Sequence, residues 1–424
     1  MTTSSTAPRS TGADSGFSGD QSATTLTGAA RDYVNRVRGG DMGSLPAVLG
    51  LVALFIIFSI LRPESFPTTY NMSNLVVQAG AICVLAMGLV PVLLLGDIDL
   101  SAGVAGGACA AVMAVLMDSN GQPWYVAVAA ALAVAVVIGL AIGTLVAKLG
   151  IPSFVVTLAF FLALQGLTLR VVGQGGAVPV RAEPILDISN SNVPPLAGWI
   201  GVILALLAFA AVTLNSYRVK AAADLQRPPL SLVLVKIGAL SVILLVATYL
   251  LNQNRARTAI LELAGMPYVV PLVAVLLVFW TFVFTRTTYG RHVYAVGGNR
   301  EAARRAGINV DVIRISVFVI CTSMAALSGI IAASRLNSVT PGSGGGNTLL
   351  YAVGAAVIGG TSLFGGRGQI RDAIIGGLVI ATIANGLGLL DQSAYVNFIV
   401  TGGVLLLAAS VDAISRRRRA ATGT

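Results

Sequence analysis

The stretch TLLYAVGAAVIGGTSLFGGRG, residues 348–368, decides the fold, because it determines how often the chain crosses a membrane. Its apolar part, residues 348–361, is shorter than the roughly 20 residues that a spanning helix needs. Glycines and polar residues follow at once, which is typical of a broken or re-entrant helix buried among its neighbours. Counting this run as a crossing gives twelve segments, and leaving it out gives eleven.

The composition is that of an all-α polytopic membrane protein. Of 424 residues, 56% are hydrophobic and 10% are charged, and the mean hydropathy is +0.86. A typical soluble domain has about 25% charged residues. Beside the short run, spanning helices are predicted from length and apolar content at residues 45–61, 75–95, 100–117, 123–147, 153–170, 196–214, 230–251, 267–285, 312–333, 370–389 and 394–411.

The distribution of basic residues favours twelve crossings. Cytoplasmic loops of membrane proteins carry an excess of Lys and Arg. With the N-terminal tail inside and every segment crossing, 20 of the 27 basic residues lie inside and six lie outside. Without the short crossing, the basic run 416–419 would fall outside. We therefore predict about twelve transmembrane segments with both termini in the cytoplasm. The net charge of +10 follows from this topology, and no nucleic-acid partner is expected.

Three regions are predicted along the chain. Residues 1–44 are rich in Ser, Thr, Gly, Ala and Asp and lack an apolar period, which indicates a disordered cytoplasmic tail and not a signal peptide. Residues 45–415 form the transmembrane domain, which includes a helix pair at roughly 196–251 and a cytoplasmic loop at 286–311. Residues 416–424 form a second, basic cytoplasmic tail.

Residues suited to catalysis or metal binding are scarce. The three cysteines lie in apolar segments, so no disulfide framework is implied, and the single histidine, His292, excludes a histidine-based metal cluster. The chain has no GxxxxGK[ST] motif to cradle ATP phosphates. We expect no catalytic residues, no metal site and no cofactor bound by this chain.

Ionisable residues are nearly absent from the predicted membrane segments. Ion-coupled carriers usually keep such groups near the midplane. Here Asp97 and Asp99 lie at the junction of two segments, and Asp391 and Asp412 lie at helix ends. Asp99 and Ser101 are interpreted as a structural turn, in which the Asp99 carboxylate caps the next helix. The energy for any transport is therefore expected to come from another subunit.

The segment GGNREAARRAGINVDVIRIS, residues 297–316, predicts a short cytoplasmic helix. Asn299 can cap it, Glu301 lies in its first turn and Arg304 in its last, an order that suits the helix dipole. Gly307 then ends it in a left-handed turn. We predict a docking helix for a cytoplasmic ATPase. The alternative is an ordinary cytoplasmic loop. The expected small-residue docking surface consists of Ala302, Ala303 and Ala306.

Four motifs in order resemble the bacterial ABC sugar-importer permeases for ribose, galactose, arabinose and xylose. They are GDIDLSAG (96–103), IPSFVVTLA (151–159), YAVGGNREAARRAGINV (294–310) and VIGGTSLFGGRG (357–368). The resemblance covers residues 45–415. The helix pair at roughly 196–251 is extra to the usual set of helices in this family. Together with ANGLGLLD at 384–391, it is most similar to the xylose-type subgroup. One departure is Asp97, where the family usually has Gly or Glu.

The resemblance implies an ABC importer permease fold in the bacterial cytoplasmic membrane, with membrane lipids around it. It also implies a homodimer of permeases, an ATPase subunit (two cassettes or one tandem cassette) that binds ATP and Mg, and a secreted or lipid-anchored sugar-binding protein. The residues expected to couple to the ATPase are Gly298, Asn299, Glu301, Ala302, Ala303, Arg304, Gly307, Ile308 and Asn309.

The function implied is alternating-access import of a monosaccharide, xylose or another pentose, driven by the separate ATPase. An ion-coupled secondary sugar transporter and a passive channel are the alternatives. A neutral sugar needs hydrogen bonds that form and break, so its path is expected to carry polar, uncharged or aromatic groups. The alternative role for each such residue is a helix–helix hydrogen bond. The candidates are Gln78, Thr157, Phe160, Phe161, Gln165 and Asn385.

Overall fold

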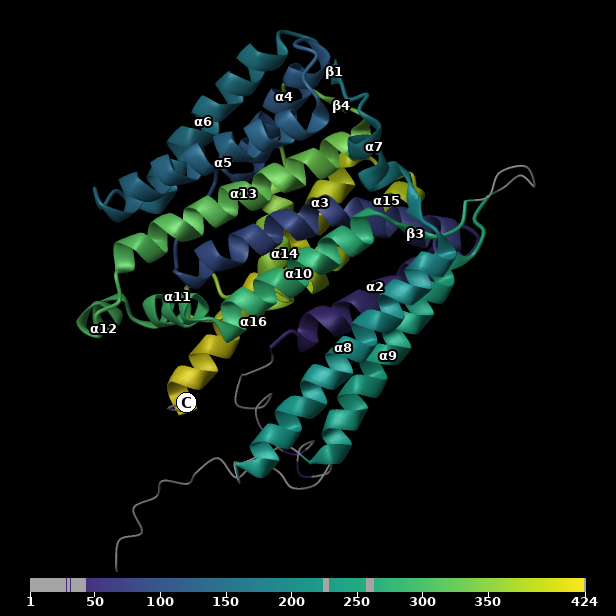
Figure 1. Ribbon diagram of the computed structural model, residues 1–424, viewed down its shortest axis with the longest axis vertical. Coiled ribbons are helices and arrows are strands. Elements are labelled where there is room, and N and C mark those ends of the chain that lie inside the picture. The colour runs from purple at the N-terminus through teal and green to yellow at the C-terminus, as the bar shows by residue number, and fades with distance from the viewer. Residues whose placement is uncertain (1–27, 29–30, 32–42, 224–228, 257–262, 423–424) are drawn as a thin grey trace, which may run out of the picture.

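The computed structural model of the chain describes residues 28, 31, 43–223, 229–256 and 263–422, and within them it is almost entirely helical (Figure 1). The predicted tail, 1–44, thus lies largely outside the described residues. The described helices are α2 (Leu45–Leu61), α3 (Thr69–Leu94), α4 (Ala102–Asp118), α5 (Trp124–Ala147), α6 (Ser153–Val172), α7 (Glu183–Asn190), α8 (Pro195–Ala222), α9 (Leu230–Asn252), α10 (Val269–Arg286), α11 (Thr288–Gly298), α12 (Arg300–Arg305), α13 (Val310–Leu336), α14 (Thr348–Gly359), α15 (Asp372–Leu389) and α16 (Ala394–Thr422).

Length and hydropathy make this an integral membrane protein. Eight of the described helices are long and apolar enough to cross a bilayer, and four apolar helical stretches are shorter. The short ones are α2, α4, α14 and the part of α16 at Phe398–Leu407. The all-α polytopic fold is therefore confirmed. Every predicted segment corresponds to one of these helices.

Some predicted boundaries are wrong because hydropathy does not detect polar helical turns. α3 begins at Thr69, six residues before the predicted 75, since the Thr68 hydroxyl caps it by accepting from Asn71 N. α8 continues beyond 214 through its basic residues to Ala222. The predicted separate tail at 416–424 is helical as far as Thr422 and continues α16.

The core lies around α3 and α13, which run through the centre of the bundle with α5 and α4 beside them (Figure 1). In α3, 72% of the apolar window is buried inside the chain, compared with 6% in both α8 and α9. The predicted extra pair therefore forms a peripheral hairpin (Figure 1). Most of its apolar side chains are exposed. Apolar surface of this kind is compatible with lipid contact.

Contacts between loops define two ends of the bundle. At one, which we call the Asp97 end, Gly366 N donates to Leu94 O at 2.8 Å and Arg314 Nη1 donates to Val146 O at 3.1 Å. At the other, which we call the Asn337 end, β1 (Val178–Pro179) pairs antiparallel with β4 (Ser338–Val339), and β2 (Asn192–Val193) pairs with β3 (Met266–Pro267). Each contact joins loops or helix ends that the distribution of basic residues places on the same side of the membrane.

The apolar run at residues 348–361 forms a short helix, α14, which follows a loop that packs against α4. β4 lies at the Asn337 end, and the loop after α14 lies at the Asp97 end. Between β4 and α14, the chain packs against the first turns of α4: a Cβ on Gly103 would lie 2.6 Å from Gly344 O and 3.3 Å from Leu349 N. α14 and α4 therefore begin side by side inside the bundle, and α14 is only 12 residues long.

Candidate functional site

The coupling segment consists of two helices, α11 and α12, which lie beyond the ends of α3, α10 and α13 (Figure 1). α12 has the predicted local chemistry. Asn299 Oδ1 accepts from Ala302 N at 2.9 Å, and Gly307 has a φ of +83°, which favours glycine. Glu301 forms exposed ion pairs with Arg304 at 3.8 Å and Arg305 at 3.3 Å.

The residues predicted to couple to the ATPase do not all face outward. Ala303 is buried against the bundle, so the prediction that it belongs to a docking surface is wrong; Ala302 and Ala306 are exposed. The helical period explains the difference, because a six-residue helix resting on the bundle must turn one face inward. Asn309 caps α13 by accepting from Val312 N, and Ile308 is half-buried. Gly298, Asn299, Glu301, Arg304 and Gly307 are exposed.

The sequence reasoning missed α11. This helix buries Val293 and Val296, and Thr287 caps it by accepting from Gly290 N. Tyr294 Oη donates to Gly368 O at 2.8 Å, and burial raises the pKa of Tyr294. α11 thus connects α12 with the loop that follows α14. Its glycines and polar residues weaken the local helical signal, and its stability comes from these tertiary contacts.

Asp97 joins α12 and α13 to the turn before α4, and we call this group the Asp97 clamp (Asp97, Arg300 and Arg314). Arg314 binds the carboxylate through Nε at 3.0 Å and Nη2 at 2.9 Å, a bidentate pair. Arg300 Nη2 lies 3.2 Å from Asp97 Oδ2 and also donates to Leu95 O at 2.7 Å. The side chain of Asp97 is 6% exposed, that of Arg314 13% and that of Arg300 42%. The clamp therefore has a buried ion pair, Asp97–Arg314, and a more solvent-exposed one, Asp97–Arg300.

Sequence reasoning treated Asp97 as a small departure from a family pattern and did not identify the clamp. The partners are separated by 217 residues, so no local pattern connects them. A signal did exist: Arg314 lies inside the predicted apolar segment 312–333, and a charge in such a segment needs a partner.

The turn between α3 and α4 is held by polar contacts on both sides of Asp97. Ser101 lies at the N-cap position of α4, which corrects the prediction that Asp99 caps it. Asp99 Oδ1 instead accepts from Ser101 N at 2.9 Å and Ser101 Oγ at 2.6 Å, so the predicted pair does form a turn. Asp99 is fully buried, and burial raises its pKa. Ile98 N donates to Ser153 Oγ, which connects the turn to α6.

The predicted sugar-path residues do not form one cluster. Asn385 and Asn71 exchange two amide hydrogen bonds of 2.9 Å, and Thr157 donates to Ser153 O at 2.9 Å and lies near Ile98 O. Asn385 and Thr157 therefore form structural hydrogen bonds within and between segments, which is the alternative role considered for the sugar-path candidates. Gln78 is half-buried in α3. The remaining candidates lie on α6, where the half-buried Phe160 and Phe161 pack against the core and Gln165 is exposed.

Gln165 lies beside the loop that precedes α14. A Cβ on Gly345 would lie 3.5 Å from Gln165 Nε2. The same loop packs against the first turns of α4 through Gly344. A polar side chain, a loop in the bundle and two helix N-termini therefore meet in one region, an arrangement that transporters use at their binding sites.

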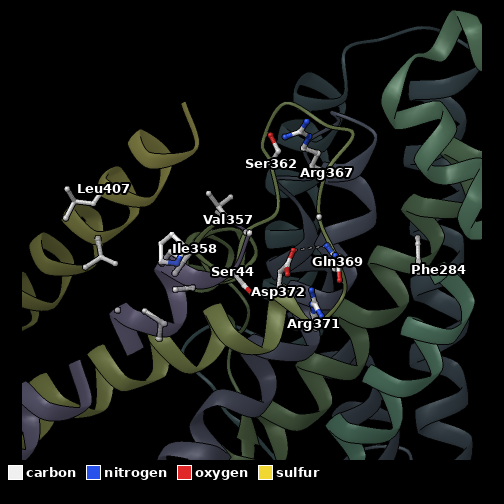
Figure 2. Close-up of a pocket in the computed structure, with 18 of the residues that line it drawn as sticks. Ser44, Phe284, Val357, Ile358, Ser362, Arg367, Gln369, Arg371, Asp372 and Leu407 are labelled. Carbon is white, nitrogen blue, oxygen red and sulfur yellow. Dashed lines mark hydrogen bonds between the residues drawn. The ribbon is translucent and has the colours of Figure 1, made fainter. Parts of the chain in front are cut away.

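A cavity of about 1250 Å³ opens at the Asp97 end, on the side of the bundle formed by α2, α14, α15 and α16 (Figure 2). None of the predicted sugar-path residues lines it. Figure 2 shows Arg367, Gln369, Arg371 and Asp372 along one wall, on and just after the loop that follows α14; Leu407 and Val357 lie on the other side.

The helical bundle, the loop that packs against the first turns of α4 and the external helix clamped to an internal turn define the class of protein, a multi-pass membrane permease. The chain matches the family described as "branched-chain amino acid transport system / permease component" over residues 71–409. It belongs to this family of permeases, and within it to the sugar ABC permeases of xylose type.

Three relatives support the family, and two of them are xylose permeases. The chain is 34% identical to the xylose transport system permease protein of Escherichia coli (strain K12) over 371 residues, 88% of this chain and 92% of that one. It is 33% identical to the xylose permease of Haemophilus influenzae, covering 88% and 98%. It is 32% identical to the ribose import permease of Escherichia coli (strain K12), covering 92% and 98%. No solved structure matches the chain.

Proposed function

We propose that this chain moves xylose, or another pentose, inward by alternating access driven by a separate ATPase. The observation that carries the proposal is the Asp97 clamp, which fastens the external helix α12 to the turn where α4 begins. A force applied to α12 therefore acts on a helix whose N-terminus lies inside the bundle. The similarity to permeases named for xylose and ribose supports a sugar as the substrate.

The proposal includes the orientation and the partners. The Asp97 end faces the cytoplasm, and both termini lie there, because this end carries most of the basic loops. Two copies of the chain, an ATPase with two cassettes or a tandem cassette, and a secreted or lipid-anchored sugar-binding protein make up the importer. ATP and Mg are bound by the ATPase. The exposed α6, with Phe160, Phe161 and Gln165, supplies the polar and aromatic lining of the sugar path.

Uptake by purified components tests the function. The permease is reconstituted in liposomes with the ATPase and binding protein from its own source, and labelled xylose, ribose and glucose are compared. We expect xylose uptake that requires ATP and the binding protein and needs no ion gradient. Uptake driven by a proton or sodium gradient without ATP would establish the secondary transporter instead. ATP-driven uptake restricted to a hexose would remove the pentose assignment and keep the importer.

Damage to α12 should uncouple ATP hydrolysis from transport. Gly307→Val forces a β-branched residue into a left-handed turn, at a cost of about 1–2 kcal/mol, and so re-aims α12. Glu301→Arg places a cation at the N-terminal end of α12 and removes its two exposed ion pairs. We expect both variants to insert and dimerise, and to lose co-purification of the ATPase or sugar-stimulated hydrolysis.

Gly121→Val is the matched control for this prediction. Gly121 also has a positive φ, +62°, with nothing within 4 Å of an added Cβ, but it lies between α4 and α5 at the Asn337 end. The Gly121→Val substitution therefore imposes a similar backbone cost but leaves the coupling segment unchanged. Normal transport and ATPase binding by both α12 variants would mean that the segment is an ordinary loop.

A further inference from the structure

The cavity in Figure 2 has a cationic end and an apolar shaft, and the proposed sugar transport uses neither. Its polar lining includes Arg291 from α11, and Arg367 and Arg371 from the loop after α14. The buried carboxylate of Asp372 also lies in the wall, but it is occupied by Gln369 N at 2.7 Å and Thr361 Oγ1 at 3.2 Å. The cavity end therefore carries a net positive charge.

The three cavity arginines differ from the arginines of α12 and of the first turns of α13. Arg300 and Arg314 bind Asp97, and Arg304 and Arg305 bind Glu301. Within the part of the chain that the structure describes, Arg291, Arg367 and Arg371 have no carboxylate within ion-pair distance, and all three are exposed. They can therefore bind an anion from outside the chain.

The apolar shaft runs along one face of α2. Pro46, Gly50, Ala53 and Ile57 line it at helical spacing, and α16 contributes Leu407 and Val404 from the opposite side. The start of α2 lies beside the loop with the arginines, because a Cβ on Gly360 would lie 3.3 Å from Gly43 O. From Pro46 to Ile57 the shaft extends about 16 Å into the bundle, at 1.5 Å per residue.

We propose that this cavity binds an anionic phospholipid, with its headgroup phosphate on the arginines and an acyl chain along α2. Basic pockets between transmembrane helices at the cytoplasmic side suit such headgroups. A free phosphate would leave the shaft empty, and a zwitterionic lipid would leave the arginines without a counter-charge. The N-terminal tail is a poorer occupant, because the residues that lead to the cavity include Arg31, Arg36 and Arg38.

Lipid retention measured by native mass spectrometry tests the cationic end. The purified full chain is mixed with phosphatidylglycerol or phosphatidylcholine that have the same acyl chains. We expect the wild type to prefer the anionic lipid on the order of tenfold or more, given the attraction of several arginines. The triple variant Arg291→Gln, Arg367→Gln and Arg371→Gln should lose most of that preference. The matched control is Lys148→Gln, Arg218→Gln and Lys220→Gln, which removes the same charge elsewhere and should keep it.

Gly50→Leu tests the shaft. A Cβ at Gly50 meets nothing within 4 Å, so the added side chain occupies the cavity without a clash in the helix. We expect it to displace phosphatidylglycerol while leaving the retention time of the protein in gel filtration unchanged. Equal retention of the two lipids by the wild type, or an unchanged preference in the arginine variant, overturns the proposal. Unchanged lipid binding in Gly50→Leu, with competition by inorganic phosphate, would show an anion site without an acyl chain and would also overturn it.

Discussion

Asp97→Ala should abolish sugar uptake and destabilise the permease by about 3 kcal/mol. The guanidinium of Arg314, whose side chain is 13% exposed, would lose its bidentate partner and remain in the bundle with Val146 O as its other acceptor. Removing one member of such a buried pair leaves an uncompensated charge, which costs more than the pair itself contributes. Arg300 would at the same time lose its ion pair, so α12 would no longer be fastened through the carboxylate to the turn before α4.

Two further variants separate stability from coupling. Arg300→Ala removes only the ion pair of the side chain that is 42% exposed, so the permease should unfold at nearly the wild-type temperature. The importer assembled with this variant should hydrolyse ATP without sugar uptake. Asp118→Ala is the control, because its pair with Arg181 is long, 3.8 Å, and exposed at the Asn337 end. Thermal unfolding of the detergent-purified protein and uptake in liposomes are the two measurements. Normal coupled transport by both Asp97→Ala and Arg300→Ala would exclude the clamp from the mechanism.

Elements specified by local chemistry were predictable from the sequence. Long apolar runs gave the membrane helices, since each must satisfy its own backbone hydrogen bonds in lipid. The ends of α12 were also predictable, because the Asn299 cap and the Gly307 turn act within a few residues. The shortness of the helix at α14 was also predictable, since the length of the apolar run and the glycines that follow it are local properties.

Features made by distant partners were not predictable. The Asp97 clamp spans 217 residues and the Asn71–Asn385 amide pair spans 314, so hydropathy and spacing do not identify the partners in either. The charge of Arg314 in an apolar segment indicates that a partner is needed, but not which residue it is. The same limit explains why Asn385 was considered for the sugar path: its polarity is visible in the sequence, and its partner is not. Ala303 shows the converse, since an alanine in a charged helix gives no indication of which side rests on the bundle.

The contact between α4 and α13 should tolerate almost no increase in side-chain size. A Cβ on Gly329 would lie 2.1 Å from Gly106 O, and a Cβ on Gly106 would lie 2.4 Å from Ala325 O. Both obstacles are backbone atoms of buried helices, so no rotamer change can relieve them. Small residues at such crossings allow helices in lipid to pack closely, because no hydrophobic effect holds them together there.

Gly329→Ala should therefore destabilise the protein by about 2–3 kcal/mol through overpacking, and Gly329→Leu should prevent recovery of a folded permease. Gly238→Ala on the peripheral α9 is the control; nothing lies within 4 Å of its added Cβ, so the better helix propensity of alanine should leave stability equal or raise it by up to about 1 kcal/mol. Yield of monodisperse protein and its unfolding temperature are the measurements. Because Gly106 lies in the same turns of α4 that contact the loop before α14, Gly329→Ala protein that still folds should transport poorly. Full stability and full uptake in Gly329→Leu would mean that α4 and α13 do not cross this closely.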